Sequence, residues 1–159
     1  MKRIKKILLL LLVCSITLPL TACGNKNVEG TLGEIMTKIY EDIPSDELPM
    51  LETFNVLEMQ PDNIEYYIGT KDIEYEDIAA SEPMMSSVAY SVVLVRMKEG
   101  ADIEAAKTKI KENVNPAKWV CVEVPKEDVI VKSKGDLIIL IMVADENTRN
   151  KLEKGFKRL

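Results

Sequence analysis

Residues 88–97 have the sequence VAYSVVLVRM, and this stretch decides the fold. Valines and other apolar residues fill most of its positions, which is typical of a strand in the centre of a sheet. Glu99-Gly100 follows directly and predicts a turn. We therefore expect a domain that is built around a central strand at 88–97.

A helix and further strands are expected after this central strand. Apolar side chains recur at helical spacing after Gly100, and Asn115-Pro116 suits the end of that helix. Lys134-Gly135 suits the turn of a hairpin, and Asp145 is placed to cap another helix. In order, we predict a helix at 102–114, a strand at 119–124, hairpin strands at 128–133 and 136–143, and a final helix.

The segment before the central strand is less regular. Thr31-Leu32-Gly33-Glu34 has capping-box spacing, which predicts an amphipathic helix to about Asp42 that docks onto its own domain. Residues 48–59 fit either a short helix or a strand, and Pro61 opens a predicted turn of helix. Residues 72–78 alternate between apolar and acidic side chains, as a strand does.

The predicted order of strand, helix, two strands and helix resembles part of a ferredoxin-like sandwich. We expect an α+β fold, a two-layer sandwich with an antiparallel or mixed sheet and with helices on one face. The missing edge strand comes either from the acidic segment near Ile73 or from residues 119–124. Residues 31–159 are long enough for a single domain of this kind.

The N-terminal segment has the layout of an export signal. A cationic start precedes a short apolar stretch at residues 7–20, too short for an ordinary membrane-spanning helix. Leu20-Thr21-Ala22-Cys23 resembles the lipobox of bacterial lipoproteins. That resemblance implies a signal peptide at 1–22 and a diacylated (palmitate-type) Cys23 followed by a tether at 23–30. Two acyl chains anchor a protein stably, so we expect it on the outer face of the cytoplasmic membrane.

Composition limits what the exported part does. Removal of 22 residues leaves 137, with 26 acidic side chains against 17 basic ones, since four of the 21 basic residues leave with the signal. This acidic balance disfavours nucleic acid as a partner. Residues 29–82 hold 15 of the acidic residues, which form either an ordinary solvated face or a surface for a cationic partner.

The residue types also exclude familiar catalytic sites. The chain has no histidine, so Ser-His-Asp and Cys-His catalysis and histidine-containing zinc sites are absent. Cys121 is the one cysteine left once Cys14 is removed and Cys23 is lipidated, which leaves no intramolecular disulfide. We expect Cys121 to be a small buried residue. No cofactor and no catalytic residue is assigned.

Three weaker binding candidates remain. Asp72, Glu74 and Glu76 share one face of the predicted strand at 72–78, where they form either a solvated face or a calcium site. The pair Met84-Met85 offers soft copper ligands or an adaptable binding surface, although core packing or a loop plug is favoured. Trp119 either covers the edge of the core or serves as an aromatic binding platform. No metal site is assigned.

Several short segments resemble a family of small lipoproteins from Gram-positive gut bacteria that are known as a domain of unknown function. The resemblance rests on four segments, namely Glu82-Pro83-Met84-Met85-Ser86, Glu99-Gly100-Ala101-Asp102, Asn115-Pro116-Ala117-Lys118-Trp119 and Lys134-Gly135-Asp136. It implies one extracytoplasmic α+β domain behind a lipid anchor and no catalytic residues.

These observations favour a membrane-anchored, non-enzymatic interaction or assembly module whose partner is a protein of the cell envelope. An alternative is an accessory lipoprotein that binds a small ligand or cation through the acidic segment or near Trp119. A third hypothesis is a carboxylate-type hydrolase of cell-wall glycans, because carboxylate pairs are abundant.

Overall fold

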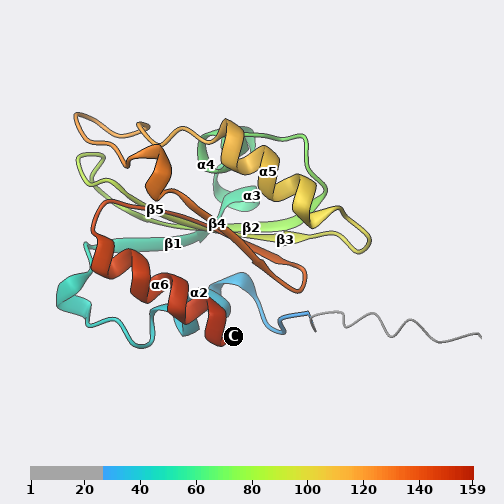
Figure 1. The fold of residues 1–159 in the computed structure, drawn as a ribbon, viewed down its shortest axis with the longest axis horizontal. Helices are drawn as coiled ribbons and strands as arrows, with labels where there is room; N and C mark the ends of the chain where they lie inside the picture. Colours follow the sequence, from blue (N-terminus) through green and yellow to red (C-terminus); the bar gives the residue numbers. More distant parts are fainter. Residues whose placement is uncertain (1–26) are drawn as a thin grey trace, which may run out of the picture.

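A computed structural model describes residues 27–159, so the predicted signal peptide at 1–22 and the predicted lipidation site Cys23 lie outside the described residues. One five-stranded antiparallel sheet forms the centre, with the strand order β1-β2-β3-β5-β4 (Figure 1). Its strands are β1 (Leu51–Asn55), β2 (Tyr75–Pro83), β3 (Tyr90–Met97), β4 (Ile130–Lys134) and β5 (Leu137–Val143). The predicted central strand is therefore confirmed as β3, the middle strand of the sheet.

Helices cover both faces of this sheet (Figure 1). One face carries α2 (Leu32–Tyr40) and α6 (Glu146–Arg158), and the other carries α3 (Val56–Met59), α4 (Ile64–Ile68) and α5 (Ile103–Asn113). Short 3-10 turns lie at Ser45–Glu47, Pro61–Asn63 and Lys126–Asp128. The α+β sandwich with an antiparallel sheet is thus confirmed, but the helices lie on two faces where the sequence predicts one.

The reason for the second helical face lies in the central strands. Every residue of β5 is buried, and alternate residues of β3 enter opposite cores. Val93 and Val95 pack toward α5, whereas Val92 and Leu94 pack toward α2 and α6. A strand that is apolar at successive positions needs cover on both sides. Because α5 and α6 lie on opposite faces, the ferredoxin-like arrangement with both helices on one face is wrong for this chain.

Strand β2 lies next to β3 and includes much of the acidic segment near Ile73. It is not an edge strand, because β1 pairs along its outer side from Leu51↔Pro83 to Asn55↔Ala79. The predicted strand at 119–124 does not form. A positive φ of 61° at Cys121 turns the backbone there, and Val120 and Val122 are exposed. This segment is instead a loop at one end of the sheet.

Local capping follows the sequence closely. Thr31 and Glu34 form the predicted capping box at the start of α2, and Asp145 accepts from the backbone N–H of Thr148 at the start of α6. Helices α2 and α6 then pack closely, since a Cβ placed on Gly155 would lie 2.3 Å from the carbonyl oxygen of Ile39. The predicted docking of the first helix onto its own domain is confirmed.

Candidate functional site

The acidic residues singled out in the sequence lie near the C-terminal end of β3. Asp72 and Glu74 precede β2, and the carbonyl oxygen of Glu74 accepts from the backbone N–H of Lys98, 2.9 Å away. The Asp72 carboxylate is bound by the ammonium of Lys109 on α5. A hollow of about 270 Å³ lies here between Asp72, Glu74, Lys71 and Lys109. Lysines thus share this hollow with the carboxylates.

Trp119 lies at the other end of the sheet, so the structure does not bring it together with Asp72, Glu74 and Glu76. It is 8% exposed and packs into the core on the α5 side, which fits the expectation that it covers the core edge. Within residues 27–159 no group of three or more acidic or cysteine side chains is arranged to hold a metal ion.

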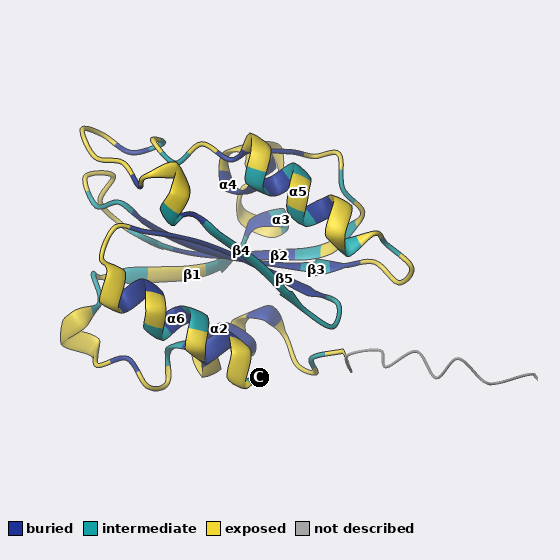
Figure 2. Ribbon diagram, viewed as in Figure 1, coloured by how far each residue is buried: buried dark blue, intermediate teal, exposed yellow. Residues whose placement is uncertain are grey.

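Three of the most exposed apolar side chains gather where β2 turns into β3. Met84 is 73% exposed and Met85 is 63% exposed, so the prediction that they pack in the core or plug a loop is wrong. The backbone N–H of Met84 donates to the carbonyl oxygen of Met50, which is 76% exposed. Figure 2 shows the loops at this end of the sheet largely as exposed. Three segments of the chain meet here.

The loop at 115–125 adds two valines to the same end of the molecule. The backbone N–H of Val120 donates to the carbonyl oxygen of Ser86 at 2.9 Å, which fixes the loop beside the β2–β3 turn. Val120 and Val122 are exposed. We call the exposed set the methionine–valine surface, and it consists of Met50, Met84, Met85, Val120 and Val122.

Cys121 lies in this loop with an exposed thiol. The sequence predicts a small buried residue there, because a strand at 119–124 would place it in a sheet. Its left-handed backbone turns the side chain of Val120 and that of Val122 outward instead. The prediction of a buried Cys121 is wrong for the same reason as the predicted strand.

A buried lysine of the loop at 115–125 connects this loop to the sheet. The side chain of Lys118 is 2% exposed, and its ammonium lies 2.5 Å from a carboxylate oxygen of Glu82 on β2. It also donates to the hydroxyl of Ser91 at 3.2 Å, and that hydroxyl donates to Glu82 at 2.6 Å. The network therefore ties the loop at 115–125 to strands β2 and β3.

Aromatic rings complete the surroundings of Lys118. Its ammonium lies 4.3 Å from the ring centre of Tyr66, 5.3 Å from that of Tyr67 and 5.5 Å from that of Trp119. Cation–π attraction partly compensates the loss of water around the charge. Burial lowers the pKa of Lys118, although Glu82 opposes that shift. Burial and the nearby Glu82 raise the pKa of Tyr67 to about 12.

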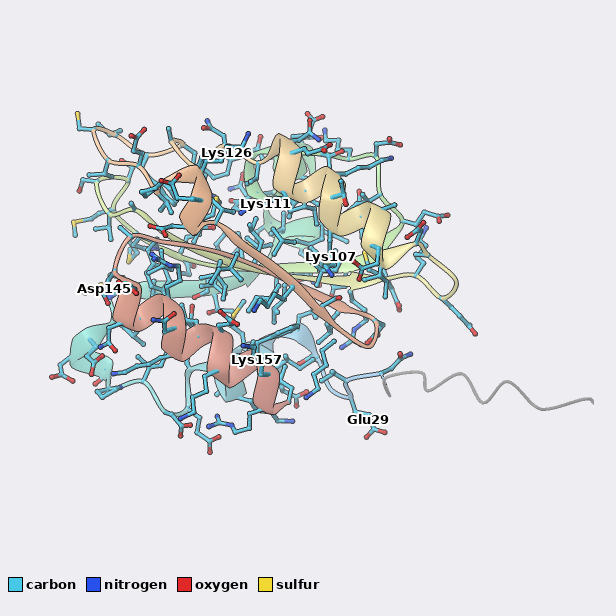
Figure 3. All side chains as sticks on the ribbon, viewed as in Figure 1. Glu29, Lys107, Lys111, Lys126, Asp145 and Lys157 are labelled. Atoms are coloured by element: carbon cyan, nitrogen blue, oxygen red, sulfur yellow. The ribbon has the colours of Figure 1, made fainter. Side chains whose placement is uncertain are left out.

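A shallow apolar hollow adjoins the methionine–valine surface. Its volume is about 210 Å³, and its apolar lining includes Pro49, Val88 and Val143. The carboxylates of Glu47 and Asp145 are also part of the wall. The hollow extends the exposed apolar area toward the start of α6, where Figure 3 labels Asp145.

The first described residues are fixed at the opposite end of the sheet. The guanidinium of Arg96 donates to the carbonyl oxygens of Val28 and Gly30, at 3.1 and 2.8 Å, and pairs with Asp136. Figure 3 shows Glu29 at this end and Asp145 at the other. Part of the segment predicted as a tether is therefore bound to the domain, and the chain enters the fold far from the methionine–valine surface.

Helices of the described part are all too short or too polar to span a bilayer. Comparisons with protein-family models, with curated proteins and with solved structures found no match to this chain.

Proposed function

We propose that this protein is a membrane-anchored extracytoplasmic lipoprotein that acts as a non-enzymatic interaction module for a protein of the cell envelope. The observation that carries the proposal is the methionine–valine surface, which exposes five large apolar side chains from three chain segments. Single exposed apolar residues are common on soluble proteins, but several of them gathered on neighbouring segments are typical of an interaction site.

The side chains of this surface suit protein binding. Methionine is unbranched and polarisable, so it adapts its shape to a partner and still excludes water. The backbone beneath the surface is held by the bonds from Val120 to Ser86 and from Met84 to Met50. The surface thus combines adaptable side chains with a positioned backbone, which limits the entropy that binding removes.

The position of the surface also supports the proposal. Lipidation at Cys23 would place the membrane on the side where Val28 and Gly30 join the domain, held by Arg96. The eight residues of β3 separate the two ends by about 26 Å, at 3.3 Å for each residue. A lipid anchor at one end leaves the methionine–valine surface free to meet other envelope proteins.

Cation binding has weaker support as an alternative. Asp72 is already paired with Lys109, and within residues 27–159 Glu76 on β2 belongs to no group of three or more acidic or cysteine side chains that is arranged to hold a metal ion. A carboxylate-type hydrolase would need two acidic groups across one cleft, and the carboxylates of the hollow near Asp72 are accompanied by Lys71 and Lys109.

Crosslinking in intact cells tests the proposal. The proteins compared are the wild type, Cys23→Ala, and a double variant with Met84→Asp and Val122→Asp. A matched control carries the same two charges on exposed helix positions, as Thr37→Asp and Thr108→Asp. We expect specific adducts with the wild type and the control, and their loss in the other two proteins.

Each variant addresses one part of the proposal. Adducts that persist in the Met84→Asp, Val122→Asp protein would show that another surface binds the partner. Adducts that persist with Cys23→Ala would separate partner binding from lipid anchoring. Recovery of Cys23→Ala in the membrane fraction, at the level of the wild type, would contradict the lipid anchor itself.

A further inference from the structure

The methionine–valine surface is surrounded by acidic residues. The segments at 44–52, 81–90, 115–125 and 143–147 form this end of the molecule, and together they contain seven acidic residues and one basic residue. The acidic residues are Asp46, Glu47, Glu52, Glu82, Glu123, Asp145 and Glu146. The basic residue is Lys118, whose ammonium is buried and paired with Glu82.

The carboxylates lie beside the apolar side chains along the chain. Glu52 follows Met50 by two residues on the edge strand β1, and Glu123 follows Val122 directly. Both glutamates are exposed, and neither forms a salt bridge within residues 27–159. Glu47 is paired with Lys151, a lysine that α6 extends toward this end. The surface therefore offers free negative charge next to exposed apolar groups.

We propose that the methionine–valine surface binds a polypeptide segment that is both apolar and basic, such as an amphipathic helix with lysines or arginines beside its apolar face. This inference rests on the proposed function and names the chemistry of its partner. The apolar side chains of that segment cover the methionines and valines, and its cations meet Glu52 and Glu123. Complementary charge speeds association and rejects acidic competitors.

The same charges argue against two other occupants. In a symmetric contact between two copies of this chain, each residue meets the same patch of the partner. Glu52 and Glu123 would then face carboxylates across the interface, which is unfavourable. An anionic lipid surface would be repelled in the same way.

Site-specific photocrosslinking in cells tests the inference on the full-length, lipidated chain. The probe is p-benzoylphenylalanine placed at Met84 or at Val122, with a control probe at the exposed Lys154 on α6. Mass spectrometry then identifies the partner peptide attached to each probe. We expect probes at Met84 and Val122 to capture segments with an excess of lysine and arginine over acidic residues.

Charge variants supply the second arm of the test. Glu52→Gln combined with Glu123→Gln removes two carboxylates from the binding surface and leaves its apolar side chains unchanged. Exposed charge pairs contribute about 0.2–1 kcal/mol each, so for two lost pairs we expect the adduct yield to fall about two- to thirtyfold. The matched control, Glu99→Gln with Glu112→Gln, removes two exposed carboxylates elsewhere and should keep the wild-type yield.

The outcomes separate this inference from the proposed function. Captured segments that are neutral or acidic, or a yield unchanged by loss of Glu52 and Glu123, would overturn the inference and leave the interaction module intact. Crosslinks between two copies of this chain would overturn it in favour of self-association. No adduct at Met84 or Val122 above the Lys154 control would contradict both proposals.

Discussion

Lys118 shows how much a single residue contributes to the candidate surface. Its ammonium is satisfied by Glu82 and Ser91 and lies among three aromatic rings. A buried ion pair adds little net stability over an apolar pair of similar size, but loss of one partner leaves an uncompensated charge. The network thus positions the loop at 115–125 while it leaves the fold sensitive to single changes.

Substitutions at this pair should therefore be strongly non-additive. We expect Glu82→Leu to lower the free energy of unfolding by about 3–5 kcal/mol, because Lys118 keeps its charge without a partner. The double variant with Glu82→Leu and Lys118→Met should recover most of that loss. Denaturation with urea measures both values, and equal losses in the single and double variants would contradict the account.

Asp145 gives a prediction for pH dependence. Its carboxylate accepts from the backbone N–H and the hydroxyl of Thr148, at 2.8 and 2.7 Å, and these bonds hold the pKa of Asp145 below its usual value. The Asp145 carboxylate therefore binds a proton more weakly in the folded state than in the unfolded state. The charged carboxylate stabilises the folded state in full above its unfolded pKa, which is near 4. This stabilisation is lost as the pH falls through the lower folded pKa.

Asp145→Asn isolates this effect, because asparagine also caps a helix but carries no charge. We expect the wild type to be more stable than the variant at about pH 6, and the difference to shrink steadily below about pH 4. Urea denaturation across this pH range measures it. A difference that is constant with pH would exclude the carboxylate as its source.

Residues that act locally were predictable from the sequence, whereas residues that act across the fold were not. The capping roles of Thr31, Glu34 and Asp145 depend on neighbours three residues away, so their spacing was sufficient. The pairing of Lys118 with Glu82 spans 36 residues and needs the sheet to bring them together. The exposure of Met84 and Met85 likewise depends on what the fold leaves uncovered.

At the scale of elements, the contact between α2 and α6 depends on one glycine. A Cβ on Gly155 would lie 2.3 Å from the carbonyl oxygen of Ile39, far closer than a normal contact, and backbone atoms must move to relieve it. Since α2 and α6 together cover one face of the sheet, any such movement loosens that core.

We expect Gly155→Ala to lower the free energy of unfolding by about 1–3 kcal/mol, as overpacking does. Gly33→Ala is the matched control, because Gly33 lies in α2 with nothing within 4 Å of an added Cβ. That variant should gain about 0.5–1 kcal/mol from the better helix propensity of alanine. If both variants were stabilised, close packing at Gly155 would be excluded.

Helices and strands with regular apolar spacing were predictable from the sequence, whereas their positions in the fold were less predictable. The strands β3 and β5 and the helices α5 and α6 were expected because apolar spacing and turn residues agree. The segment at 119–124 alternates like a strand, but Pro116 and Pro125 flank it and Cys121 is left-handed. Val120 and Val122 face solvent and only Val124 is buried in the core, so the alternation of apolar residues there does not mark a strand of the sheet.

At the scale of the whole molecule, Arg96 fixes where the chain enters the domain. Its guanidinium binds the carbonyl oxygens of Val28 and Gly30 and the carboxylate of Asp136, and that carboxylate accepts from the backbone N–H of Val28. A tether that is expected to be free thus has its last residues attached to the sheet.

Arg96→Met should release this segment without unfolding the domain. We expect hydrogen exchange at the amide of Val28 to rise by roughly tenfold or more, since hydrogen bonds to charged groups contribute about 1.5–3 kcal/mol. Exchange in β3 and β5 should stay slow, and Lys98→Met, an exposed neighbour, should change neither. Unchanged exchange at Val28 would show that other contacts hold the segment.

The attachment at Val28 also limits how far from the membrane the proposed partner can be bound. With lipid on Cys23, four residues lie between the anchor and Val28, so this link of five Cα-to-Cα steps spans at most about 18 Å. Adding the length of β3 places the methionine–valine surface within a few tens of ångströms of the bilayer. The protein then searches for its partner by diffusing in the plane of the membrane. The effective concentration of the methionine–valine surface is high in a thin layer next to the bilayer and almost zero beyond that layer. Partners whose basic segment lies outside that layer would be excluded by distance alone, whatever their intrinsic affinity.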